Sequence, residues 1–67
     1  MTHLNDLYIH GMEVITYKDG EVYSVDVREN NTDGDIIAGY TDLTSEDDAE
    51  FVARAFIDGY RLGKAQK

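Results

Sequence analysis

Residues 12–28 constrain the fold most strongly, because they predict a β-hairpin. Two runs of β-prone residues, 12–17 and 22–27, flank the dipeptide Asp19-Gly20. Aspartate and glycine tolerate the positive φ angles that a two-residue type I′ turn requires. A turn centred on this dipeptide sets three cross-strand pairs on one face: Thr16/Tyr23, Val14/Val25 and Met12/Val27. We expect that face to point toward the core.

A third strand and then a helix are predicted after the hairpin. Residues 29–35 form a turn cluster rich in Asn, Asp and Gly, and residues 36–41 have the composition of a strand. Thr44 or Ser45 provides an N-cap, with an acidic residue three positions later in either case. Apolar residues then recur at helical spacing, and we expect this stripe to pack on the sheet. Its members are Val52, Ala55, Phe56, Gly59 and Tyr60, with Phe51 and Leu62 at its margin.

Three further features complete the expected architecture. Gly63 is a candidate C-cap, and Gly39 together with Gly59 indicates a close approach between helix and sheet. Residues 2–9 fit either a short capped helix or a strand, and we expect the short helix. The chain has no proline, repeat or low-complexity linker that would mark a boundary. We therefore predict one α+β domain over residues 1–67, a three-stranded antiparallel meander with a C-terminal amphipathic helix packed on one face.

Composition excludes several classes of function. The 14 acidic residues against 6 basic ones give a net charge of −8. This charge argues against direct binding of nucleic acid or of an anionic membrane, since phosphate contacts need a basic surface. The absence of cysteine excludes disulfides, thiolate zinc sites and cysteine nucleophiles. No apolar run approaches the roughly 18 residues of a membrane span, and no basic segment followed by an apolar stretch opens the chain. We expect a cytoplasmic protein.

The residues that catalysis or metal binding requires do not occur together in the sequence. His3 and His10 are the only imidazoles, and a pair without a third ligand makes a poor metal site. Neither serine has a neighbouring base or an oxyanion-hole signature, and the glycines form no phosphate-binding loop. Residues 29–35 imitate the first half of a calcium loop, but Tyr40 stands where the bidentate glutamate is needed. We therefore expect no enzyme, no cofactor and no metal.

Negative charge is concentrated in one part of the chain. Residues 1–53 hold 13 of the 14 acidic residues, whereas residues 54–67 are net positive. The densest acidic cluster is Asp42, Glu46, Asp47, Asp48 and Glu50, with Asp33 and Asp35 one strand earlier. One interpretation is complementation of the helix dipole together with solubility. The other is that rigidly held carboxylates imitate the phosphates of nucleic acid and bind a basic groove.

The face of the hairpin opposite the core supplies candidate apolar anchors for such a partner. Ile15, Tyr17 and Val22 lie on it, flanked by Glu13 and Asp26. The alternative is that the N-terminal segment covers this face and leaves it unavailable.

Part of the chain resembles the DNA-mimicking anti-CRISPR inhibitors of Cas9. The resemblance rests on the loop 31–34, the following strand, the helix start 45–48 and residues 51–60, about half of the chain. In that family a three-stranded sheet packs on helices, and acidic side chains occupy the site where Cas9 reads its PAM duplex. The resemblance implies a role for Asp33, and by proximity for Asp35 and Glu46. Those inhibitors are longer and strongly acidic after the helix, whereas this chain ends in a basic segment.

We therefore expect a non-enzymatic acidic protein-binding module, of the kind that a phage or mobile element uses as an inhibitor. Its expected partner is the basic groove of a nucleic-acid-binding protein. The alternative is a homo-oligomeric module, at its simplest a homodimer. In that case the face with Ile15, Tyr17 and Val22, or an open sheet edge, would pair the copies.

Overall fold

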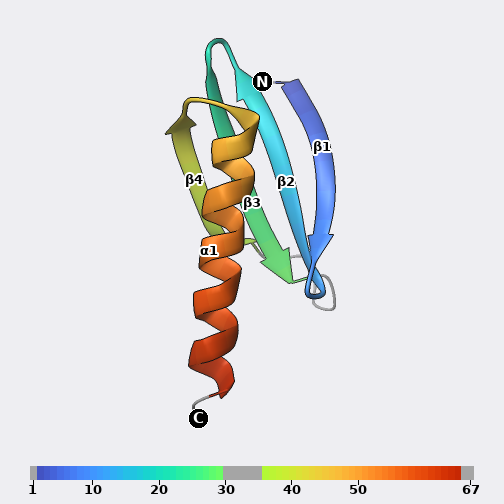
Figure 1. Cartoon of the computed structure of the whole chain (residues 1–67). Helices are drawn as coiled ribbons and strands as arrows, with labels where there is room; N and C mark the ends of the chain where they lie inside the picture. Colours follow the sequence, from blue (N-terminus) through green and yellow to red (C-terminus); the bar gives the residue numbers. More distant parts are fainter. Residues whose placement is uncertain (1, 30–35, 66–67) are drawn as a thin grey trace.

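A four-stranded antiparallel sheet carries one long helix across one of its faces (Figure 1). The computed structural model describes residues 2–29 and 36–65. Its strands pair in chain order, and its elements are β1 (Thr2–Ile9), β2 (Met12–Asp19), β3 (Val22–Glu29), β4 (Ile36–Leu43) and α1 (Glu46–Ala65). The α+β class is therefore as predicted. The prediction of three strands is wrong, because the meander has four.

The additional strand is formed by the N-terminal segment, for which we expected a short helix. β1 pairs antiparallel with β2 and places Leu7 opposite Val14 and Ile9 opposite Met12. The turn between the two strands is His10-Gly11, with φ angles of 51° and 79°. Positive φ at both central residues is the geometry of a type I′ turn, whose twist matches that of the strands. Pairing with β2 satisfies backbone groups of β1 and adds its apolar side chains to the core, which a short helix in isolation could not do.

The hairpin of β2 and β3 turns one residue later than predicted. Asp19 pairs with Val22, so the central turn residues are Gly20 and Glu21. Gly20 has a φ of 65° and Glu21 is not in the positive region, the pattern of a type II′ turn. The strand register therefore differs by two residues from the predicted one, with Thr16 opposite Val25. A shift of two keeps every side chain on its predicted face.

The core lies between this face of the sheet and α1. Its buried apolar residues are Ile9, Met12, Val14, Val25, Val27, Ala49, Ala53 and Ile57. The helix begins as expected, since the backbone N–H of Asp48 donates to Ser45 Oγ at 3.1 Å. Ser45 is therefore the N-cap. α1 contacts β2, β3 and β4, and its C-terminal turns extend past the end of the sheet (Figure 1).

The buried stripe of α1 differs from the predicted one. Ala49, Ala53 and Ile57 are fully buried at a spacing of four residues. The partly buried neighbours are Val52, Phe56 and Tyr60. The predicted members Ala55 and Gly59 are exposed, so the helix is rotated from the expected orientation.

Two predictions about glycines are also corrected. Gly63 lies within α1, so it is not the C-cap, and a Cβ at Gly59 would meet no atom within 4 Å. Gly39 is at a close approach, but to β3 and not to the helix. A Cβ there would lie 3.1 Å from Asp26 Oδ1.

Replacing Ile57 by alanine tests the position of the core. Ile57 is fully buried, so Ile57→Ala should lower the free energy of unfolding by about 2–5 kcal/mol. Ile36→Ala makes the same change at a side chain that is 57% exposed and should cost much less. Urea denaturation of both variants measures the difference. Equal losses would show that α1 does not pack through Ile57.

The first turn offers a second test. Because His10 has a φ of 51°, His10→Asn should raise the free energy of unfolding by about 0.5 kcal/mol. Asn-Gly is the preferred type I′ dipeptide, whereas His10→Val puts a β-branched residue in the same conformation and should destabilise the protein. Denaturation midpoints of the two variants should move in opposite directions. A stabilising valine would contradict the turn geometry.

Candidate protein-binding surface

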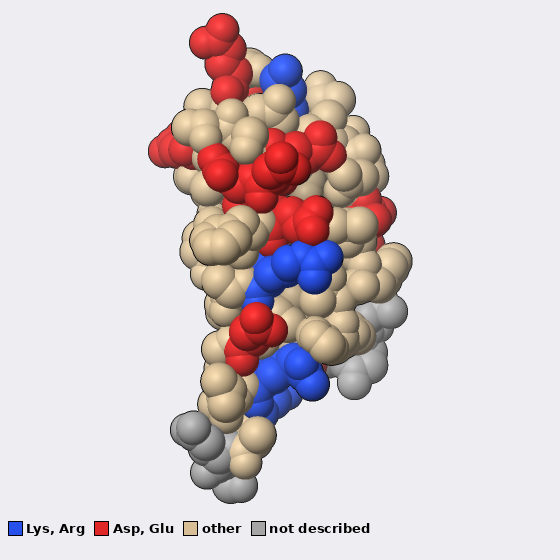
Figure 2. Space-filling view, in the orientation of Figure 1, with Lys and Arg blue, Asp and Glu red and all other residues tan. Residues whose placement is uncertain are grey.

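The structure brings five of the predicted site residues together at one end of the molecule. We call this set the acidic surface: Asp42 near the end of β4, and Glu46, Asp47, Asp48 and Glu50 in the first turns of α1. All except the half-buried Glu50 are exposed. Figure 2 shows acidic side chains gathered over the first turns of α1, whereas basic side chains lie over its middle and its C-terminal part, with a further acidic patch between them. The carboxylates at the helix start also complement the positive end of the helix dipole.

Hydrogen bonds hold three of these carboxylates in place. Asn5 Nδ2 of β1 donates to Glu46 Oε2 at 2.5 Å, and Thr44 Oγ1 donates to the carboxylate of Asp48. Arg54 Nε donates to Glu50 Oε2 at 2.9 Å. Three of the five carboxylates of the acidic surface are thus held by contacts with the sheet, the segment before α1 or the helix itself.

Asp42 is placed by an irregularity in β4. Its φ is 61°, in the left-handed region that aspartate tolerates better than most residues. The register of β3 and β4 shifts between Tyr23 and Val25, so β4 contains an extra residue there. Such a bulge redirects side chains at a sheet edge. Here it coincides with the exposed carboxylate of Asp42.

The remaining predicted site residues do not join the acidic surface. Asp33 and Asp35 lie outside the described residues. Ile15, Tyr17 and Val22 point to the face of the sheet opposite α1, and Ile15 is only 9% exposed. β1 extends the sheet beside β2, so it does not cover this face as the alternative interpretation required. The predicted anchors and carboxylates therefore belong to two different faces.

An ion pair that the sequence did not reveal lies on that open face. Arg28 Nε donates to Glu13 Oε1 at 2.6 Å, and the Glu13 side chain is only 8% exposed. The two residues are opposite each other on β2 and β3. The hydrogen bond and charge of Glu13 raise the pKa of Arg28. The correct register of β2 and β3 would have predicted this ion pair, but that register depends on locating the turn between the two strands correctly.

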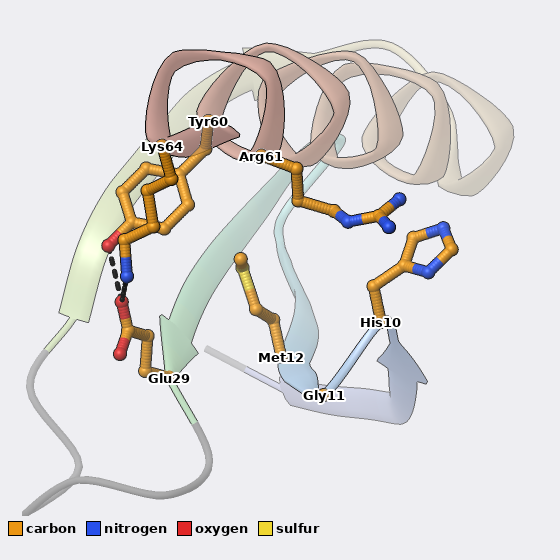
Figure 3. A pocket seen from close by; sticks show the side chains of 7 residues that line it. All are labelled: His10, Gly11, Met12, Glu29, Tyr60, Arg61 and Lys64. Atoms are coloured by element: carbon orange, nitrogen blue, oxygen red, sulfur yellow. Dashed lines mark hydrogen bonds and ion pairs between the residues drawn. The ribbon is translucent and has the colours of Figure 1, made fainter. Parts of the chain in front are cut away.

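A cleft of about 390 Å³ lies at the other end of α1. It is bounded by the β1–β2 turn, the end of β3 and the last turns of the helix (Figure 3). The hydroxyl of Tyr60 donates to Glu29 Oε1, and Lys64 Nζ lies 3.3 Å from the same oxygen. The lining residues are His10, Gly11, Met12, Glu29, Tyr60, Arg61 and Lys64. No local pattern in the sequence predicts this site, because Tyr60 and Lys64 are 31 and 35 positions from Glu29.

These contacts change the acid–base properties of Glu29 and Lys64. The hydrogen bond from Tyr60, followed by that from Lys64, lowers the pKa of Glu29. The pKa of Lys64 is raised, first by Tyr60 and then by Glu29. Lys64 Nζ also lies 4.8 Å from the centroid of the Tyr60 ring. The cluster of Glu29, Tyr60 and Lys64 thus connects the end of β3 with the last turns of α1.

Two classes of feature were looked for in the part of the chain that the structure describes: a metal site and a membrane-spanning helix. Within residues 2–29 and 36–65, no three His, Asp or Glu side chains are grouped as a metal ion would need. Among those residues there is also no helix with the length and apolar character to cross a bilayer. Comparison with known proteins finds no matching family model, no matching curated protein and no matching solved structure. Function must therefore be inferred from this chain's own surface.

Removing the Tyr60 hydroxyl tests the Glu29 cluster. Tyr60→Phe keeps the ring but loses the donor, so the pKa of Glu29 should rise toward its ordinary value of 4.5. Because the folded-state pKa is lowered, the bond stabilises the fold above the ordinary pKa and is lost as pH falls through the folded-state value. Tyr60→Phe should therefore destabilise the protein near neutral pH and less so in acid. An NMR titration of the Glu29 carboxyl measures the shift, and an unchanged pKa would contradict this account.

Proposed function

We propose that this protein is a non-enzymatic binding module whose acidic surface docks on a basic surface of another protein. The observation that supports the proposal is the acidic surface itself, in which carboxylates of β4 and α1 are exposed together at one end of the molecule. Its centre is the first turn of α1, with Glu46, Asp47 and Asp48. Complementary potentials steer association and reject partners of the wrong charge.

The partner that fits best is a groove built to hold the phosphates of nucleic acid. Such grooves are lined by Lys and Arg and recognise negative charge at regular spacing. Carboxylates fixed on a helix and a strand end can compete for them without any catalytic group. Glu46 and Asp48 each accept a hydrogen bond from a neutral side chain, which restrains the carboxylate and lowers the entropy cost of presenting its charge. Glu50 is restrained as well, but its partner Arg54 compensates its charge.

In this proposal the protein acts as an inhibitor that displaces nucleic acid, of the kind encoded by phages and mobile elements. Its place of action is the cytoplasm, where such grooves meet nucleic acid. The resemblance to DNA-mimicking inhibitors of Cas9 is consistent with this role through Glu46 and its neighbours. The resemblance mainly implies a role for Asp33. This residue lies outside the described residues.

The proposal is tested by reversing charge on the acidic surface. A tagged Glu46→Lys/Asp47→Lys variant and the wild type are used to capture partners from nuclease-treated bacterial lysate at low and high salt. The matched control, Asp6→Lys/Asp26→Lys, makes the same change of net charge on the open face of the sheet. Circular dichroism confirms that all three proteins are folded.

Wild type and control should retain a basic nucleic-acid-binding protein at low salt and release it at high salt. The Glu46→Lys/Asp47→Lys variant should bind that partner roughly tenfold more weakly or worse. With the isolated partner, added wild-type protein should displace a labelled DNA duplex. Equal capture by both charge-reversed proteins, or a partner that keeps its DNA, would rule out the proposal.

A further inference from the structure

α1 carries a second apolar stripe on the side that faces away from the sheet. Phe51 and Leu62 are 72% and 61% exposed, among the most exposed of the large apolar residues described. Ala55 and Gly59 are also exposed and lie between them. We call these four residues the outer stripe: Phe51, Ala55, Gly59 and Leu62. Their spacing of four, four and three residues keeps them on one side of a helix, as in a helix–helix interface.

A row of alternating charges follows the outer stripe along one flank. Each member immediately precedes a residue of the outer stripe, so the row has the same helical spacing. In chain order the row is Glu50, Arg54, Asp58 and Arg61, which is negative, positive, negative, positive. Arg54 and Glu50 form an exposed ion pair within the helix. Within residues 2–29 and 36–65, neither Asp58 nor Arg61 has an ion-pair partner.

This order of charges is complementary to itself when the helix is reversed. In an antiparallel pair of helices, residues on the same flank meet across the interface in opposite order. Glu50 then lies beside Arg61 of a second copy, and Arg54 beside the second copy's Asp58. A two-fold axis repeats both pairs, so four ion pairs form. In a parallel two-fold pair this flank lies on opposite sides of the two helices, so its charges would not meet across the interface.

The apolar residues match in the same arrangement. The register that pairs Glu50 with the second copy's Arg61 also places Phe51 beside the second copy's Leu62. Ala55 and Gly59 then lie at the middle of the contact. A Cβ at Gly59 would meet nothing within 4 Å, so the helix backbone is accessible there. Small residues at such a crossing let two helices approach closely.

We propose that α1 forms an antiparallel two-fold pair with α1 of a second copy of this chain, through the outer stripe and its charged flank. This surface is distinct from the sheet face and sheet edges considered for self-association above. The inference does not depend on the proposed function. In the pair, Glu50 of the acidic surface takes part in the ion pairs, whereas the first-turn carboxylates Glu46, Asp47 and Asp48 of each copy lie beyond them, one set at each end of the dimer.

Sedimentation equilibrium over a range of protein concentrations tests the pairing. Phe51→Glu should convert the dimer to a monomer, because it places a charge in the apolar contact. Tyr8→Glu is the matched control, since Tyr8 is 61% exposed but lies on the open face of the sheet. The control should remain dimeric. Circular dichroism confirms that both variants fold.

Charge reversal tests the orientation of the helices. Glu50→Arg and Arg61→Glu should each weaken the dimer roughly tenfold or more, because each creates two like-charge contacts. The double variant Glu50→Arg/Arg61→Glu has the composition of the wild type and should restore the dimer. Glu46→Lys alone should dimerise normally, because Glu46 accepts a hydrogen bond from Asn5 of β1 and lies on the sheet side of α1, so loss of partner binding and loss of pairing are separable.

Three results would overturn the proposal. The first is a wild type that stays monomeric at every concentration. The second is a dimer that Tyr8→Glu disrupts and Phe51→Glu does not, which would indicate pairing through the sheet face. The third is a double variant as weak as the single ones, which would exclude the antiparallel charge register.

Discussion

The contact of Ala49, Ala53 and Ile57 with the valines of β2 and β3 determines the rest of this structure. The single helix covers one of the two faces of the four-stranded sheet and leaves the other open. Alanines at two of the three innermost positions let α1 lie close to the sheet, so that Val14, Val25 and Val27 are fully buried. The rotation of the helix is thereby fixed. It directs the outer stripe to solvent and places the first-turn carboxylates at one end of the molecule.

The sequence predicts which side chains of the β2–β3 hairpin face the core, but not the number of strands in the sheet. Alternation around residues 12–28 identified the core side of the hairpin correctly, because an error of two residues in register does not move a side chain to the other face. β1 was missed because Asn5 and Asp6 are poor strand formers. The signal that could have found it is His10-Gly11 between Ile9 and Met12. Positive φ at both residues makes this a type I′ turn, the type that the sequence predicts for Asp19-Gly20.

The orientation of α1 could not be obtained from periodicity, because the helix has two apolar stripes. The large residues Phe51, Phe56 and Leu62 dominate any sum of hydrophobicity, and the expected stripe mixed members of both sides. Ala49 and Ala53 contribute little to such a sum, yet they are fully buried. Only the shape of the sheet surface decides which stripe packs inward.

The candidate site was predictable only where it depends on the helix start. The cap at Ser45 fixes the position of Glu46, Asp47 and Asp48, and both follow from local sequence. Ile15, Tyr17 and Val22 lie on the face opposite the core as predicted, but the separation of that face from the acidic surface depends on tertiary structure. The Tyr60–Glu29–Lys64 cluster joins distant segments. What the structure adds is a helix with a buried side that builds the fold and an exposed side with complementary charges.

The most direct test of this two-sided helix is an isotope-filtered NOE experiment on a mixture of labelled and unlabelled protein. Within one chain, Phe51 and Leu62 are separated by about 16 Å along the helix axis, too far for an NOE. Cross-peaks between the Phe51 ring of one copy and the Leu62 methyl groups of another are the predicted result. If the only contacts detected link α1 to its own sheet, the outer stripe is not an interface between copies and the central claim is wrong.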